Sequence, residues 1–334
     1  MATGGLQSGR VRVFLRDGTL VRAVGRAELA SEELIGVWTS SGGFWVREYS
    51  SGRVAGYRYQ GGMATDTFWL PTGLERFTPT PQGGLIGKAE LPNFDWKRLL
   101  HQPLEEQAVL NVNVIGEREE VDTIFALDVR HMDWMLGIRG EGSRYPSQVL
   151  IRQPFADHDL TWLDPERGSV GVVRRSGSPG VVEVFEVFAT GDTAWHRRLD
   201  LPSVELSAEE AEEAIEDVLA TLRRAAESGG HVFTEAELRS IADSVLHVPS
   251  HLPVVARVVA SSAADVWLQT PETEDGLSVW YSIRRGDDEA TPRRVLVPSS
   301  FQIQDASETH IWGMPTNSAG ERVVRGLALV PPVD

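Results

Sequence analysis

A short apolar segment with tryptophan at its centre recurs along this chain of 334 residues. It occurs around Trp45, Trp267 and Trp312, and each copy is followed by a polar turn and an alternating strand. Residues 84–87 and 170–174 fit the same position without the indole. The spacing is about 40 residues from Trp45 to the first of these and 45 residues from Trp267 to Trp312. A period of 40–50 residues with about four strands predicts a β-propeller, in which sheets stack as blades around an axis.

The rest of the chain also predicts short strands, rich in Val, Ile, Phe, Trp and Tyr and separated by Gly, Pro, Asp and Ser. Asp17-Gly18 marks a hairpin turn between two such strands. The repeat divides the chain into the outer strands of an incomplete first blade at 10–25, full blades at 33–71, 74–128, 148–202 and 252–298, and a three-stranded blade at 299–331.

The sequence therefore predicts an all-β fold, a single β-propeller domain over residues 1–334. We expect the amino-terminal strands to pair with the last blade. Five blades result if they complete that blade, and six if one blade is split or truncated; six is the number we favour, with the amino-terminal blade incomplete.

One helical insertion interrupts the strands at 206–246. Ser207 with Glu210, and Thr234 with Glu237, form capping boxes that each open a helix. Apolar residues at helical spacing follow both boxes, and Gly229-Gly230 separates the two helices. We expect two helices between the blades at 148–202 and 252–298, with the acidic residues at the start of the first helix facing solvent.

Composition excludes several classes of function. The chain carries 32 Lys+Arg and 48 Asp+Glu, a net charge of −16, which argues against non-specific binding of nucleic acid. The absence of cysteine excludes disulfides, thiolate catalysis and Cys-ligated metal sites. No apolar stretch approaches the 18 residues of a transmembrane helix. The first nine residues lack the pattern of a secretory signal, which at face value indicates a cytoplasmic protein or a true start upstream.

Three segments carry a resemblance to a known group of proteins: Arg10 to Arg26, Leu252-Pro253 with Asp265 to Leu268, and Phe301 to Leu329. They resemble six-bladed β-propellers related to NHL-repeat proteins, above all envelope proteins of unknown function from soil bacteria of high genomic GC. Thirty Arg against two Lys fits such a genome. The resemblance implies a periplasmic or cell-surface location. The chain departs from the pattern at residues 27–34, where a Gly-Pro-Gly-Glu-like turn is usual, and in lacking an export signal and an additional strand pair.

Two polar segments are the best candidates for a ligand-binding site. His131, Asp133 and Trp134 lie in an expected long loop at 129–146, and long loops at one mouth of a propeller would line its pocket. Asp157, His158 and Asp159 stand together before a strand, where a His between carboxylates could be a base of raised pKa or a metal ligand. Trp96, in another long inter-strand segment, could stack on a sugar or anchor a partner.

Other patterns do not predict chemistry. His247 and His251 have the i, i+4 spacing of a zinc protease helix, but Pro249 lies between them and the glutamate of that motif is absent. The acidic turns at 272–275 and 287–289 are typical of solvated hairpin turns. The sequence contains no EF-hand calcium loop, nucleophile elbow or phosphate-binding loop. We therefore assign neither catalytic residues nor metal ligands.

Two functions remain open. The first, which we favour, is a non-enzymatic propeller without cofactor that binds a protein, peptide or carbohydrate through its loops, as a monomer. The alternative is a propeller-type hydrolase or lactonase with acidic, calcium-binding residues at its centre. The fold supports both classes, so the site must decide between them.

Overall fold

The computed structural model describes most of the chain, with gaps. The described residues are 2–5, 10–14, 19–24, 34–39, 43–48, 53–59, 66–69, 74–80, 84–89, 106–115, 118–138, 147–164, 166–175, 177–261, 265–287, 289, 291–315 and 323–330.

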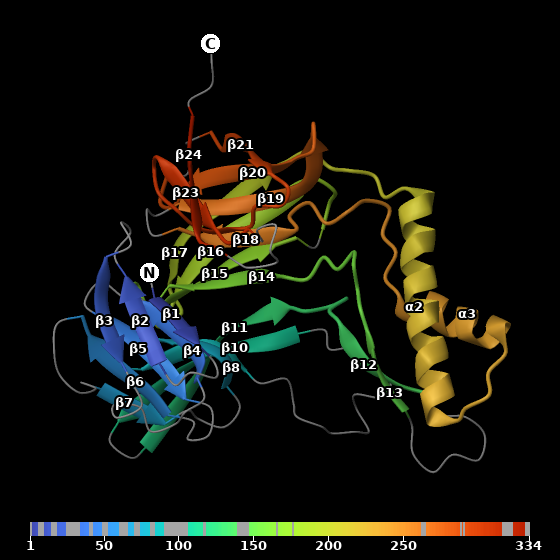
Figure 1. Ribbon diagram of the computed structural model, residues 1–334, viewed down its shortest axis with the longest axis horizontal. Coiled ribbons are helices and arrows are strands. Elements are labelled where there is room, and N and C mark those ends of the chain that lie inside the picture. Colours follow the sequence, from blue (N-terminus) through green and yellow to red (C-terminus); the bar gives the residue numbers. More distant parts are fainter. Residues whose placement is uncertain are drawn as a thin grey trace.

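Seven antiparallel sheets follow one another along this part of the chain (Figure 1). The first three sheets are β1 (Ala2–Gly5), β2 (Arg10–Phe14) and β3 (Leu20–Val24); β4 (Leu34–Thr39), β5 (Gly43–Glu48), β6 (Arg53–Arg58) and β7 (Asp66–Trp69); and β8 (Leu74–Pro79), β9 (Leu85–Ala89), β10 (Glu106–Ile115) and β11 (Arg118–Asp128). A two-stranded hairpin follows, β12 (Trp134–Ile138) and β13 (Ser147–Ile151).

The last three sheets are β14 (Leu160–Asp164), β15 (Ser169–Arg174), β16 (Val181–Phe188) and β17 (Thr193–Asp200); β18 (Arg257–Ala260), β19 (Asp265–Glu274), β20 (Leu277–Arg284) and β21 (Arg293–Pro298); and β22 (Ile303–Ala306), β23 (His310–Gly313) and β24 (Arg325–Ala328). Helices α2 (Ala208–Gly229) and α3 (Glu235–Val245) lie between β17 and β18.

The sheets are arranged as the blades of a β-propeller. Within each sheet every strand pairs with the next strand along the chain. The first strands of successive sheets also contact one another: β1 contacts β4, β8 contacts β14, β14 contacts β18, and β18 contacts β22. First strands that gather while later strands lie further out are the signature of blades around a common centre.

The repeated tryptophan position has one place in this architecture. Trp45, Trp267 and Trp312 lie in β5, β19 and β23, each the second strand of its sheet. The segment 170–174 also falls on a second strand, β15, and residues 85–87 of the segment 84–87 fall on another, β9. The sequence repeat is therefore a structural repeat.

Three tryptophans lie directly opposite a glycine on the neighbouring strand: Trp45 opposite Gly56, Trp162 opposite Gly171 and Trp312 opposite Gly326. The indoles cover the bare backbone. A Cβ added at Gly56 or Gly171 would lie 2.8 Å or 1.8 Å from the ring, and one at Gly326 would lie 3.2 Å from it. Glycine supplies the room for an indole, and the indole shields the backbone that glycine leaves open.

Apolar side chains of adjacent sheets pack together between the blades. Val184 and Trp195 of one sheet share a cluster with Val266 and Leu268 of the next. Trp267, which is fully buried, belongs to a cluster that continues into the last sheet. This packing explains why the central strands are apolar on both faces.

A buried carboxylate strengthens one of these contacts. Glu186 on β16 has no exposed surface and accepts hydrogen bonds from Arg167, Ser169 and Trp195. Arg285, from the turn after β20, lies 3.6 Å from the same carboxylate. The charge is therefore neutralised partly within its own blade and partly by the next.

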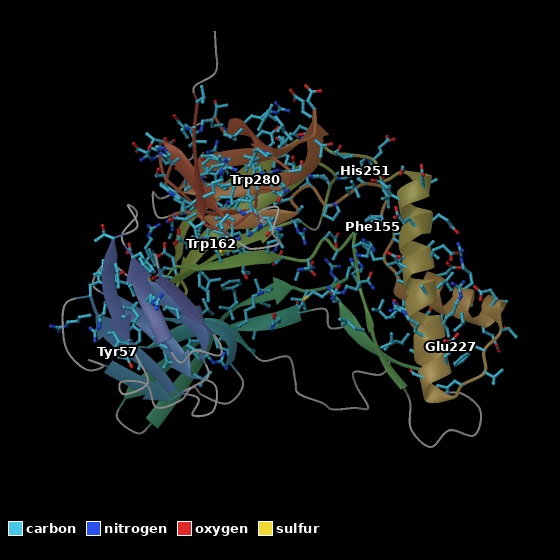
Figure 2. The ribbon with its side chains drawn as sticks, in the orientation of Figure 1. Tyr57, Phe155, Trp162, Glu227, His251 and Trp280 are labelled. Carbon is cyan, nitrogen blue, oxygen red and sulfur yellow. The ribbon has the colours of Figure 1, made fainter. Side chains whose placement is uncertain are left out.

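The predicted helices are confirmed with both capping boxes. In the described part of the chain these helices pack on the β12–β13 hairpin, and the helices and the hairpin stand to one side of the other sheets (Figure 1). Their shared core contains Val149 and Ile151 of β13, Leu219 and Leu222 of α2, and Phe155, which lies beside α2 (Figure 2). We call β12, β13, α2 and α3 the side lobe.

Two predictions about the strands were wrong. Residues 147–151 form β13 of the side lobe, because Val149 and Ile151 pack against the helices, and the blade begins at Leu160 instead of 148. The expected loop at 129–146 contains β12. The amino-terminal sheet has three strands, with β1 added to the two expected strands although its sequence has no apolar pattern.

The expected closure is also not observed. In the described part of the chain, β1–β3 form a sheet of their own instead of completing the sheet β22–β24. Among these residues no helix is long and apolar enough to cross a membrane.

Candidate functional site

Three chain segments converge where the side lobe joins the propeller. The hairpin leaves the sheet β8–β11 at residues 129–133 and returns to β14 through residues 152–159. These two crossings are joined at their bases, because the Asp159 amide donates to the Asp128 carbonyl at 2.8 Å and the Asp128 amide donates to the Asp159 carboxylate at 2.9 Å. The third segment, 246–251, follows α3. We call this meeting point the junction.

Two histidines and one carboxylate meet in the junction. His131 Nδ1 lies 2.8 Å from Asp157 Oδ1. The rings of His131 and His247 are stacked, with centroids 3.5 Å apart and planes at 2°. One possible ligand atom from each of the three residues lies within 4.8 Å of the others, which makes them a group that could hold a metal ion.

His131 occupies an unusual backbone position. Its φ is 58°, in the left-handed region, within the turn that joins β11 to β12. Histidine is among the residues that tolerate this region, at a cost of about 1 kcal/mol or more. The conformation turns the chain sharply and sets the imidazole beside Asp157.

Gln153 fixes the third segment against the other two. Its side chain is buried, its Nε2 donates to the Val245 carbonyl at 2.6 Å, and its Oε1 accepts from the His247 amide at 2.9 Å. Its own backbone amide donates to the carboxylate of Asp133 at 2.8 Å. One amide side chain thus holds the end of α3 and, with it, His247.

Asp159 has a structural role in the junction. It is buried and forms an ion pair with Arg174 of β15, at 3.1 Å. Burial raises the pKa of Asp159, while the hydrogen bond from Arg174 opposes that rise. The carboxylate joins the returning crossing to the blade and is not open to a ligand.

His158 differs from the base that the sequence suggested. Burial, followed by the charge of Arg175, lowers the pKa of His158 to about 4 instead of raising it. Arg175 is buried and donates to the carbonyls of His158 and Val255, at 2.7 and 2.5 Å. His158 Nδ1 is buried and has no hydrogen-bond partner among the described residues.

His247 has the same feature on its other ring nitrogen. Its Nε2 is buried and has no partner in the described part of the molecule. Burial lowers the pKa of His247 and His131 lowers it further, while Asp157 raises it. A lower pKa favours the neutral form of the ring, which can accept a hydrogen bond or coordinate a metal.

The exposed edge of the junction carries charges of both signs. The side chains of His131 and Asp157 are 39% and 31% exposed. Arg130, 54% exposed, pairs with Asp128, and Arg152, 79% exposed, lies 3.7 Å from Asp133. This edge is accessible to a partner, whereas the residues that position it are buried.

The structure brings together part of the predicted set. His131 and Asp157 contact each other in the junction, and Asp133 lies there too, bound to the Gln153 amide. Trp134 begins β12, but its side chain is not among those described, and Trp96 lies outside the described residues.

Sequence reasoning missed His247, Gln153 and Arg175. His247 was weighed only as part of a zinc protease motif, and no spacing relates it to residues 116 and 90 positions earlier in the chain. The one sequence signal that could have identified His247 was its position just after the second helix, where the inserted segment must return to the blades.

Comparison with known proteins adds little to this geometry. No protein-family model matches the chain, and no curated protein matches it. Solved structures with a similar course include a predicted exported protein from Bacteroides fragilis, with 8% identity, a TM-score of 0.39, and 93% of this chain and 75% of that chain covered.

Two further structures are the β-propeller domain of Swd1 from Myceliophteria thermophila and a hypothetical selenium-binding protein from Sulfolobus tokodaii. Both have 8% identity and a TM-score of 0.36. The first match covers 96% of this chain and 80% of that chain, and the second covers 97% and 74%. These TM-scores are too low to support an argument about function.

Proposed function

We propose that this chain is a non-catalytic β-propeller binding protein that recognises a protein, peptide or carbohydrate at the junction. The observation that carries the proposal is that exposed polar side chains at the edge of the junction are positioned by buried side chains beneath them. Arg130, His131, Arg152 and Asp157 are accessible to a partner. Hydrogen bonds of buried polar side chains hold the bases of both crossings and the segment after α3.

Such an arrangement favours recognition for a physical reason. Loops held in one conformation before a ligand arrives lose less entropy on binding than mobile loops. Exposed arginine is also enriched in protein interfaces. The hydrolase alternative expects a cluster of acidic calcium ligands. Among the described residues, the one group that could hold a metal ion contains two His and a single Asp. No specific observation therefore favours the hydrolase alternative.

Two finer features belong to the same proposal. We count six blades, one for each sheet of three or four strands, with the β12–β13 hairpin assigned to the side lobe. The resemblance to NHL-related propellers of the bacterial envelope supports a periplasmic or surface location. Fractionation of the source cells with an antibody against this chain tests that location, and recovery in the cytosol would contradict it.

The binding function is tested with purified full-length chain on a glycan array and against a displayed random-peptide library. We expect at least one ligand whose affinity falls tenfold or more in the double variant Arg130→Ala, Arg152→Ala, because both side chains lie at the exposed edge. Arg284→Ala is the matched control, since Arg284 is 56% exposed and ion-paired on another sheet.

Two results would count against the binding proposal. One is that neither screen yields a ligand, or that the affinity of every ligand is equally insensitive to the junction and control variants. The other is turnover of chromogenic esters or lactones that the junction variant abolishes, which would indicate an enzyme.

A further inference from the structure

We propose that His131, Asp157 and His247 form a binding site for a divalent transition metal of the Zn²⁺ type. The residues come from three segments that meet in the junction, and their possible ligand atoms lie within 4.8 Å of one another. The inference rests on this geometry and goes beyond the binding function proposed above.

The donor set selects the class of metal. Two imidazole nitrogens and one carboxylate oxygen suit Zn²⁺ and neighbouring first-row ions, whereas Ca²⁺ and Mg²⁺ prefer sites made entirely of oxygen. Three protein ligands leave a fourth tetrahedral position for water or for a ligand group. A single carboxylate offsets one of the ion's two charges, so an anionic group would be favoured at the open position.

The distances require only a local adjustment. Metal–ligand bonds of about 2.0–2.1 Å place two ligands of a tetrahedral ion about 3.3 Å apart. His131 Nδ1 and Asp157 Oδ1 are already at 2.8 Å, and the widest separation in the group, at most 4.8 Å, must close by about 1.5 Å. The stacked rings, whose centroids are 3.5 Å apart and whose planes are at 2°, must also tilt, because one ion cannot lie in the planes of both.

His247 can make this adjustment. Its Nε2 is buried without a hydrogen bond, so coordination through that atom would break no hydrogen bond among the described residues. Its backbone is held by Gln153, so the ring can tilt while the segment stays in place. Gln153 is therefore a positioning residue for the third ligand, a role that neighbouring residues commonly play around metal sites.

The metal would connect the side lobe to the propeller. His131 and Asp157 lie on the two crossings that join the hairpin to the blades, and His247 follows the last helix of the insertion. An ion bound to all three would stabilise the folded chain, since the unfolded chain cannot present this arrangement.

The first experiment measures Zn²⁺ affinity in tag-free full-length protein that has been stripped with a chelator, by competition with a chromophoric chelator. We expect one Zn²⁺ per chain and a rise in thermal unfolding temperature on binding. Asp157→Asn, His247→Gln and His131→Asn should each lower the affinity at least tenfold. Asparagine is chosen at 131 because it tolerates the left-handed backbone. His310→Ala, at an exposed histidine on β23, is the control and should bind like the parent.

A second measurement separates a metal site from a structural role. Co²⁺ bound to the stripped parent protein should show the visible absorption bands of tetrahedral coordination, and the three ligand variants should lack them while keeping the parent's circular dichroism. Gln153→Ala should weaken Zn²⁺ binding about 10–100-fold and retain the tetrahedral Co²⁺ spectrum, as expected for a positioning residue.

The proposal is overturned if the parent binds no Zn²⁺ more tightly than the ligand variants do, or if its Co²⁺ spectrum is octahedral. Metal binding and recognition can fail separately. Metal binding is measured without a partner, and the array and library screens are run both with Zn²⁺ and with chelator. If the protein binds Zn²⁺ but the screens yield no ligand, the metal site is supported and the binding function is refuted. If the screens yield a ligand but the protein binds no Zn²⁺, the binding function is supported and the metal site is refuted.

Discussion

Replacing Gly171 by alanine tests the pairing of tryptophan with glycine that recurs in the blades. The new Cβ would lie 1.8 Å from the indole of Trp162, so the buried ring must move. Overpacking of this kind costs about 1–3 kcal/mol, and a separation so far inside contact distance places it near the upper end. Alanine recovers about 0.5–1 kcal/mol through lower chain entropy, which leaves a net loss of about 2 kcal/mol.

Thermal unfolding followed by far-ultraviolet circular dichroism measures this loss. For a chain of this length unfolding cooperatively, about 2 kcal/mol corresponds to a fall of about 3 °C in the unfolding midpoint. Gly326→Ala is the matched control, because its Cβ would meet Trp312 at 3.2 Å on an exposed strand. We expect that variant to stay within about 0.5 kcal/mol of the parent.

A double-mutant cycle then shows whether the indole causes the penalty. In a Trp162→Ala background the ring is gone, so Gly171→Ala should cost nothing or stabilise slightly. An equal penalty with and without the indole, or a Gly171→Ala variant as stable as Gly326→Ala, would refute this explanation of the repeat.

Three further outcomes follow from the described contacts. Glu186→Gln should destabilise the chain by about 2 kcal/mol in urea unfolding, because the charge-assisted hydrogen bonds from Arg167, Ser169 and Trp195 to the buried carboxylate are weakened or lost; a change below about 0.5 kcal/mol would contradict this. Ser207→Ala should cost about 1 kcal/mol and speed hydrogen exchange at the start of α2, with exchange in α3 as the internal control. Burial raises the pKa of Asp265, so the folded state binds more protons than the unfolded state just above the ordinary Asp range, and stability falls as pH rises through that window. Asp265→Asn should flatten this part of the urea-stability profile, and an unchanged profile would show that Asp265 is not its source.

The sequence predicted the blades where a local pattern repeats. The indoles at Trp45, Trp267 and Trp312 identified second strands because each blade uses the same packing position. Both capping boxes were read correctly because a cap is determined by residues three positions apart.

The errors arose where a contact between distant segments decides the structure. Residues 147–151 read as the first strand of a blade, and only the packing of Val149 and Ile151 on the helices assigns them to the side lobe. The same limit explains the site. His131 and Asp157 could be selected from their polar neighbours, but His247 joins them only through the fold.

The shared core of the hairpin and the helices has a practical consequence for dissecting this protein. Deleting the helical insertion alone would expose Val149, Ile151 and Phe155, which the helices now bury. The hairpin would then present an apolar surface prone to aggregation. A version reduced to the blades would require the hairpin and the helical insertion to be deleted together. The gap left by the hairpin would be closed by joining Asp128 to Asp159, whose backbones are already hydrogen-bonded to each other.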